Sequence, residues 1–176
     1  MRARRGVGIV GSVILVATGP GACSGKDGGI ALRSGAFDDG GAIPVRYTCE
    51  GDNVSPPLVW SKVDDDVKAL ALVVADPEAP GGIFHHWIVL DLDPQARSMA
   101  EGKVPADATQ ALGTSDNPTY IGPCPPVGEE HHYLFTLFPL DRRLDLPDGT
   151  ATKVALDAID AARLPGEGEL HGTFGR

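Results

Sequence analysis

Apolar residues occur along this chain in short runs separated by turn residues, a pattern that predicts strands rather than long helices. Ala69–Ala75 and Leu134–Phe138 are nearly uninterrupted runs, whereas Ile30–Ser34 alternates apolar and polar positions. Val54–Trp60 holds two prolines, so we expect it to be extended, with Trp60 at the edge of the core. The expected strands and extended segments are Ile30–Ser34, Ile43–Thr48, Val54–Trp60, Ala69–Ala75, Trp87–Leu92, Leu134–Phe138 and Glu169–Phe174.

One stretch has the spacing of an amphipathic helix. Ala151–Arg163 carries an apolar stripe, Thr150 can cap its start, and Leu164–Gly166 ends it. The stripe consists of Val154, Ala158, Ile159 and Ala162. The polar segment Leu92–Asn117 predicts a long surface connection, with at most a helical turn at Asp107–Ala111. Many strands and one helix near the C-terminus predict a mainly β fold, a β-sandwich of Greek-key type.

Composition and charge restrict the classes of function. The 176 residues suit one domain with a short appendage, and 23 glycines with 15 prolines favour turns and short strands. The formal net charge is −9. Because no basic stripe is available to displace counterions, we expect no nucleic-acid partner.

The first residues have the pattern of an export signal. Three arginines, at positions 2, 4 and 5, precede the apolar run Val7–Ala17, and small residues follow it. A buried or disordered N-terminal helix is the alternative, but the glycines and the charged head suit neither. The predicted division of the chain is a signal at 1–22, a flexible glycine-rich tether at 23–29 and one domain at 30–176.

Cys23 follows Gly21 and Ala22, an arrangement that resembles the signal of bacterial lipoproteins, although Pro20 departs from it. We therefore expect lipid on Cys23, in a bacterial protein that is exported and held at the cell membrane, or else secreted. Removal of the signal leaves 12 basic against 24 acidic residues, a charge of −12. The surface itself is then not attracted to anionic lipid, so any membrane attachment rests on the lipid anchor.

Two cysteines remain if Cys23 carries lipid. In an exported protein, Cys49 and Cys124 are a candidate disulfide that would constrain the unfolded chain. The alternative is two separate buried thiols, because spacing alone does not show that their Cα atoms lie close together.

Four of the five histidines form two adjacent pairs, His85-His86 and His131-His132, at the starts of apolar runs. Neighbours on a strand point to opposite faces, so each pair can offer only one imidazole to a shared site. The simpler interpretation is four half-buried histidines at strand ends. Proline-rich loops and acidic residues beside both pairs favour one small anion-binding pocket.

The loop Gly122–Pro126 (GPCPP) precedes the second histidine pair. Because proline lacks an N–H, only Gly122 and Cys124 can donate backbone hydrogen bonds there, and the prolines stiffen the loop into a plausible anion clamp. Alternatively the loop only ends a strand. Tyr133 can supply a phenol donor or pack in the core. Asp76 can orient an imidazole and raise its pKa, or only begin an Asp-Pro turn. With no Lys or Arg in the predicted site, we expect weak binding of a small dianion.

These motifs together resemble the phosphatidylethanolamine-binding protein family, which includes the Raf kinase inhibitor proteins, and in particular its bacterial branch. The resemblance covers about residues 31–176. The motifs that carry it are Asp76–Pro80 with His85–Trp87, Gly122–Pro126 with His131–Tyr133, Tyr47–Gly51 with Ser55–Trp60, and Gly172–Arg176.

The resemblance implies the family's β-sandwich and its pocket for phosphate-type head groups. By motif, Asp76 and Glu78 match the loop acids and His86 the histidine of the following strand. Cys124 takes the position whose backbone N–H faces the anion. His131 and Tyr133 match the family's His-x-Tyr pair.

Two classes of function follow. The first is a non-catalytic binding protein for a phosphate-type anion or a phospholipid head group, without cofactor or metal. Inhibition or modulation of a partner enzyme and a homodimer are further expectations, from the family and from its bacterial relatives. The second is a metal-dependent enzyme that uses His86, His131 and Asp76. No H-E-x-x-H motif supports the second class.

Overall fold

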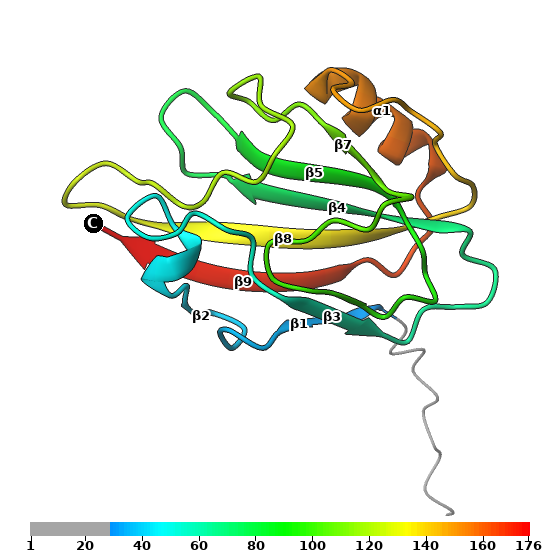
Figure 1. Ribbon diagram of the computed structural model, residues 1–176, viewed down its shortest axis with the longest axis horizontal. Helices are drawn as coiled ribbons and strands as arrows, with labels where there is room; N and C mark the ends of the chain where they lie inside the picture. Colours follow the sequence, from blue (N-terminus) through cyan, green and yellow to red (C-terminus); the bar gives the residue numbers. More distant parts are fainter. Residues whose placement is uncertain (1–28) are drawn as a thin grey trace, which may run out of the picture.

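The computed structural model describes residues 29–176, which form two β-sheets and one α-helix (Figure 1). The predicted signal at 1–22, Cys23 and all of the tether except Gly29 lie outside the described residues. In chain order the elements are β1 (Ala31–Ser34), β2 (Gly41–Ala42), a 3₁₀ helix η1 (Val45–Tyr47), β3 (Leu58–Ser61), β4 (Ala69–Asp76), β5 (Phe84–Leu92), β6 (Ser98–Met99), β7 (Thr109–Ala111), β8 (Glu130–Leu140), α1 (Thr152–Ala162) and β9 (Gly168–Gly175).

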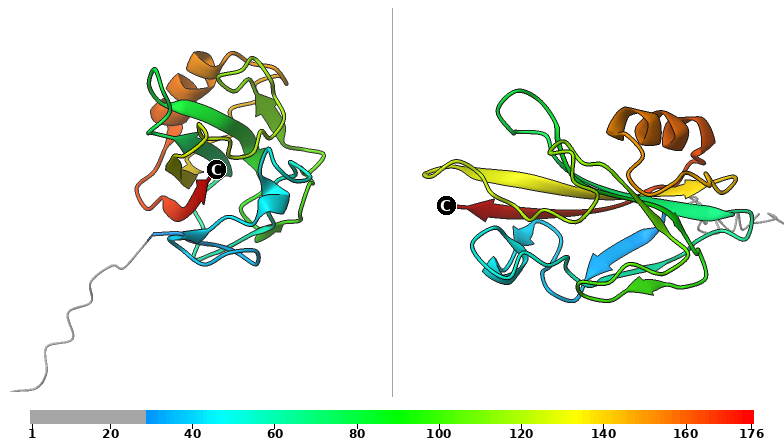
Figure 2. Two further views of the ribbon diagram at one scale, coloured as in Figure 1. Left: turned by 90° about the vertical axis from the view of Figure 1, so that its left-hand side faces the viewer. Right: turned by 45° about the horizontal axis from the view of Figure 1, so that its top comes forward.

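The sheets and the helix are stacked in three layers. The large sheet has the order β2-β9-β8-β4-β5-β7 and the small sheet the order β1-β3-β6. Figure 2 shows the small sheet on one side of the large sheet and α1 on the other. The predicted mainly β fold, with one helix near the C-terminus, is confirmed.

The central strand β4 contributes to two cores, which explains its continuous apolar sequence. Its alternate residues Leu70, Leu72 and Val74 face the core between the sheets. The residues between them, Ala69, Ala71 and Val73, face the core under α1. A strand that is covered on both faces has no polar side, so its sequence does not alternate.

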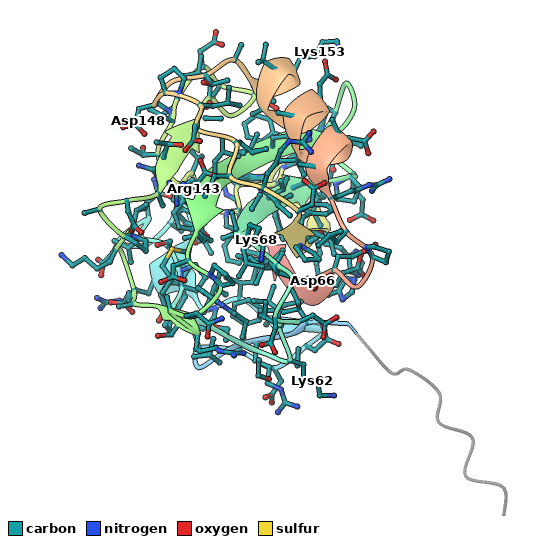
Figure 3. The ribbon with its side chains drawn as sticks, turned by 90° about the vertical axis from the view of Figure 1, so that its right-hand side faces the viewer. Lys62, Asp66, Lys68, Arg143, Asp148 and Lys153 are labelled. Carbon is teal, nitrogen blue, oxygen red and sulfur yellow. A yellow bond between two sulfur atoms is a disulfide. The ribbon has the colours of Figure 1, made fainter. Side chains whose placement is uncertain are left out.

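Antiparallel pairing brings four strand ends together. β4 pairs with β5 and β8, and β8 pairs with β9, all antiparallel. The end of β4, the starts of β5 and β8 and the end of β9 therefore lie at the same edge of the large sheet, on the left of Figure 1. The opposite edge, where Lys62, Asp66 and Lys68 lie, faces the viewer in Figure 3.

Two segments differ from their predicted structures. Ile43–Thr48 was expected to be a strand, but its second half is the 3₁₀ helix η1. The backbone N–H of Tyr47 bonds to the carbonyl of Pro44, and the Thr48 hydroxyl bonds to that of Val45, so local bonds replace a strand ladder. The expected helical turn at Asp107–Ala111 is instead β7, because it pairs with β5 at the sheet edge.

The helix is where it was predicted and buries Ile159 and Ala162 of the predicted stripe, but its cap differs, and Ala155 is buried where Val154 was expected. Thr150 donates its hydroxyl to the carbonyl of Pro147, and the N-cap position belongs to Ala151, without a side-chain bond. Val154 is 52% exposed. The buried residues are Ala155, Ile159 and Ala162. Trp60, expected at the core edge, is fully within the core.

Within residues 29–176, no helix has both the length and the apolar character needed to cross a membrane.

The end of β5 has an unusual backbone conformation, and a side chain connects it to a neighbouring loop. Asp91 has a positive φ of 60°, and its buried carboxylate accepts the backbone N–H groups of Leu144 and Asp145 at 2.7 and 2.8 Å. This contact ties β5 to the loop that leads from β8 to α1.

Candidate functional site

A cavity of about 330 Å³ lies where the four strand ends meet, and five of the seven predicted site residues line it. We call it the His131 cavity. Its lining residues are Asp76, Ala79, Pro80, Phe84, His86, Ile121, Gly122, Cys124, Pro125, Pro126, His131 and Arg176. The loop after β4, the loop before β8 and the residue after β9 surround it, at the left of Figure 1.

A buried ion pair forms one wall of the His131 cavity. Nδ1 of His131 lies 2.7 Å from Oδ2 of Asp76, and the two side chains are only 6% and 5% exposed. The hydrogen bond to Asp76 raises the pKa of His131 above its ordinary value; burial opposes this shift and Glu129 adds to it. Asp76 therefore orients the imidazole and favours its protonated form.

His86 has the opposite protonation preference. Its Nδ1 lies 2.8 Å from the carbonyl oxygen of Ile121 and therefore donates to it. Burial lowers the pKa of His86, so the neutral ring is favoured. With the proton on Nδ1, Nε2 is a hydrogen-bond acceptor. The cavity thus combines an imidazole whose protonated, donor form is favoured with one whose neutral, acceptor form is favoured, an arrangement that suits an oxyanion that carries one hydroxyl.

The other member of each histidine pair is outside the cavity, as strand alternation predicted. His132 is 63% exposed and its Nδ1 lies 3.0 Å from Glu78. The carboxylate of Glu78 also accepts the backbone N–H of His132 at 2.6 Å. Glu78 is therefore a predicted site residue that the structure does not bring into the lining of the cavity.

Of the two predicted backbone donors in the GPCPP loop, the N–H of Gly122 is already used within the protein. The N–H of Gly122 is donated to Oδ1 of Asn53 at 2.7 Å. A Cβ on Gly122 would collide with the carbonyl of Tyr47, so glycine is required by close packing rather than by ligand contact. The N–H of Cys124 has no backbone acceptor among residues 29–176. The sequence did not show that Asn53 takes the first donor.

The predicted disulfide is confirmed. Cys49 and Cys124 are bonded, with their Cα atoms 5.5 Å apart. The backbone N–H of Cys49 also bonds to the carbonyl of Pro123 at 3.1 Å. The GPCPP loop is therefore fixed to the turn after η1 by a covalent and a hydrogen bond.

Tyr133 is a second predicted site residue that is absent from the lining of the cavity, although it contacts the lining residue His86. The residue is 1% exposed, and its hydroxyl has no hydrogen-bond partner in the described part of the chain. Its ring packs edge-on against His86 at 5.3 Å. Burial raises the pKa of Tyr133, and the backbone N–H of Cys124 opposes this shift. The Tyr133 hydroxyl and the Cys124 N–H are therefore neighbours beside His86.

Arg176 is a lining residue that the sequence analysis missed, and it corrects the expectation of a site without arginine. Its Nη1 lies 3.4 Å from Sγ of Cys124 and 3.3 Å from the carbonyl of Pro125, while Nε lies 3.1 Å from Glu50. The pairing of β9 with β8 places Gly175 opposite Glu130. The next residue, Arg176, therefore lies in the wall of the cavity.

Elsewhere on the described surface, fewer groups are placed to bind a ligand. A larger hollow of about 670 Å³ lies at the opposite edge of the sheets, where the charged lining side chains are Asp64 and Asp66. It has no cation for an anion to contact. Across residues 29–176, no group of three His, Cys, Asp or Glu side chains is arranged to hold a metal ion.

The fold and the His131 cavity together define a class of protein, a β-sandwich with one small polar pocket at the ends of its central strands. The sequence matches the family model of phosphatidylethanolamine-binding proteins over residues 33–175. The chain therefore belongs to the phosphatidylethanolamine-binding protein family.

Relatives and solved structures agree. A UPF0098 protein of Methanothermobacter thermautotrophicus is 40% identical, covering 82% of this chain and 98% of the relative. A Mycobacterium tuberculosis protein named as lipoprotein LppC is 43% identical, covering 82% and 72%. The crystal structure of the family homolog CT736 from Chlamydia trachomatis has a TM-score of 0.78 at 36% identity, covering 85% and 99%. E. coli YbcL has the same TM-score at 24% identity, covering 84% and 98%, which shows the fold alone.

Proposed function

We propose that this protein is a non-catalytic binding protein whose His131 cavity takes a small phosphate-type anion, either free or as the head group of a phospholipid. The observation that carries the proposal is the buried Asp76–His131 pair in the cavity wall, which presents a charged imidazole. A charge-assisted hydrogen bond from such a group is roughly twice as strong as a neutral one.

Three further donors support the proposal. The N–H of Cys124 has no backbone acceptor in the described residues, and it lies close to the buried hydroxyl of Tyr133. The guanidinium of Arg176 reaches the same lining. Because Arg176 is already paired with Glu50, it adds little net charge, and we expect binding in the millimolar range.

The family and its relatives support the wider setting of the proposal. A relative that is named as a lipoprotein agrees with the proposed lipid on Cys23, after removal of residues 1–22. The Cys49–Cys124 disulfide agrees with export to an oxidising compartment. Inhibition of a partner enzyme and assembly into a homodimer stay predictions. Membrane fractionation of Cys23→Ser cells tests the anchor, since the variant protein should leave the membrane fraction.

Substitution of His131 tests the pocket. His131→Ala removes the charged donor, so the affinity for inorganic phosphate should fall about tenfold or more. Imidazole NMR titrations with phosphate and with O-phosphoethanolamine measure the effect, and a dispersed spectrum verifies the fold. The two ligands distinguish a site for free phosphate from one that prefers a head group.

His171→Ala is the matched control. His171 also lies beside an aspartate, with its Nδ1 3.1 Å from Asp39, but it is 48% exposed and does not line the His131 cavity. It should leave phosphate binding unchanged. Equal binding by wild type and His131→Ala would remove the pocket assignment.

A further inference from the structure

Glu129, the residue immediately before β8, reaches over the buried imidazole of the His131 cavity. Its Oε2 lies 3.2 Å from Nε2 of His131, and its side chain is 57% exposed, whereas that of His131 is 6% exposed. The chain around Glu129 is held in place: its N–H bonds to the carbonyl of Pro126 and its carbonyl accepts the N–H of Arg176. The carboxylate is therefore positioned beside His131 by the backbone.

This contact uses the part of His131 that a ligand needs. Nδ1 is bonded to Asp76 at 2.7 Å, so Nε2 is the only ring nitrogen left for an anion. An imidazolium between two carboxylates donates one N–H to each of them. An anion that binds His131 must therefore take the Nε2 hydrogen bond from Glu129.

The two carboxylates are held with different strength. Asp76 is buried, and its Oδ1 also accepts the backbone N–H of Glu78 at 2.8 Å. The Glu129 carboxylate has no second hydrogen bond within residues 29–176. Because an exposed carboxylate gains little from one ion pair, Glu129 is the partner that can exchange.

We infer that Glu129 is a built-in competitor for the anion pocket, whose carboxylate occupies the Nε2 hydrogen bond of His131 and has to leave when an anion binds. The inference rests on the proposed function, since it concerns the same pocket. It makes Glu129 the residue that sets the pocket's affinity, because its negative charge also repels a dianion that approaches His131.

The test compares two neighbouring acids. Glu129→Gln keeps the size of the side chain and removes its charge. Glu130→Gln is the matched control, because Glu130 is exposed and its side chain has no hydrogen bond or ion pair within the described residues. The probes are sulfate, which remains a dianion around neutral pH, and phosphate, which also carries a hydroxyl for Nε2 of His86; binding is followed by imidazole NMR of His131.

We expect Glu129→Gln to bind sulfate about fivefold more tightly than wild type, with Glu130→Gln unchanged. The pKa of His131 should also fall in Glu129→Gln alone, because Glu129 raises it. An equal gain in both variants would mean a general charge effect and overturn the inference. The inference would also be overturned if wild type and Glu129→Gln bound the anion with equal affinity. If neither wild type nor Glu129→Gln binds sulfate or phosphate, the proposed function fails and the inference falls with it.

Discussion

At the scale of single residues, the chemistry of the cavity is set by what each imidazole is bonded to. The hydrogen bond to Asp76 favours the protonated form of His131, while burial favours neutral His86 against the opposing effect of its hydrogen bond to the Ile121 carbonyl. His86 and His131, which line the same cavity, therefore have pKa values shifted in opposite directions. This difference, rather than the number of histidines, determines what the cavity can bind.

The Asp76–His131 pair should make stability depend on pH. Because the folded pKa of His131 is raised, its contribution to the free energy of unfolding is full below the unfolded pKa of about 6.5 and is lost as pH rises through the folded value. Asp76→Asn should weaken this dependence, leaving the smaller part due to Glu129, and lower the free energy of unfolding by about 3 kcal/mol. Urea unfolding across pH measures both effects. An unchanged pH profile in the variant would show that His131 is not charged through Asp76.

Residue types and motif order were enough to predict which residues of the candidate site lie together. They predicted Asp76, His86, Cys124 and His131 as neighbours of one pocket, and these residues line one cavity. The remainder depends on contacts that sequence spacing does not show. Asn53, which lies 69 residues earlier in the chain, accepts the hydrogen bond from the N–H of Gly122. Arg176 enters through the pairing of β9 with β8.

At the scale of elements, long apolar runs were predicted well and short segments were not. The strands β4, β5, β8 and β9 are specified by their own apolar residues. By contrast, β7 has three residues and is a strand only because β5 offers it a partner. In so short a segment, the local preference for helix or strand has less influence than pairing with the strand at the edge of a sheet.

The end of β5 gives a prediction at this scale. Asp91→Ala should lower the free energy of unfolding by about 2 kcal/mol, since the N–H groups of Leu144 and Asp145 lose their acceptor. Asp91→Asn should lose less, because asparagine keeps one acceptor oxygen and tolerates positive φ. Chemical denaturation of both variants makes the comparison. Equal losses would show that the carboxylate charge, not the acceptor, holds this turn.

At the scale of the whole molecule, the disulfide joins the segment after η1 to the loop before β8. It closes 75 residues of chain, so replacing both cysteines (Cys49→Ser with Cys124→Ser) should lower the free energy of unfolding by roughly 4 kcal/mol. The backbone bonds of Cys49 and Gly122 remain to hold the GPCPP loop, so phosphate binding should survive in the folded fraction. Calorimetry and the phosphate titration separate the two effects. Lost binding at unchanged stability would contradict this assignment.

The double burial of β4 has a consequence for the chain before it folds. Ala69–Ala75 is seven residues without a charge or a proline, which is the composition of an aggregation-prone segment when it is exposed. Charged residues stand at both of its ends: Asp64–Asp66 and Lys68 precede it, and Asp76 with Pro77 follows it. Such gatekeepers disfavour stacking between unfolded chains. Asp76 therefore protects the nascent protein with the same carboxylate that holds His131 in the finished one.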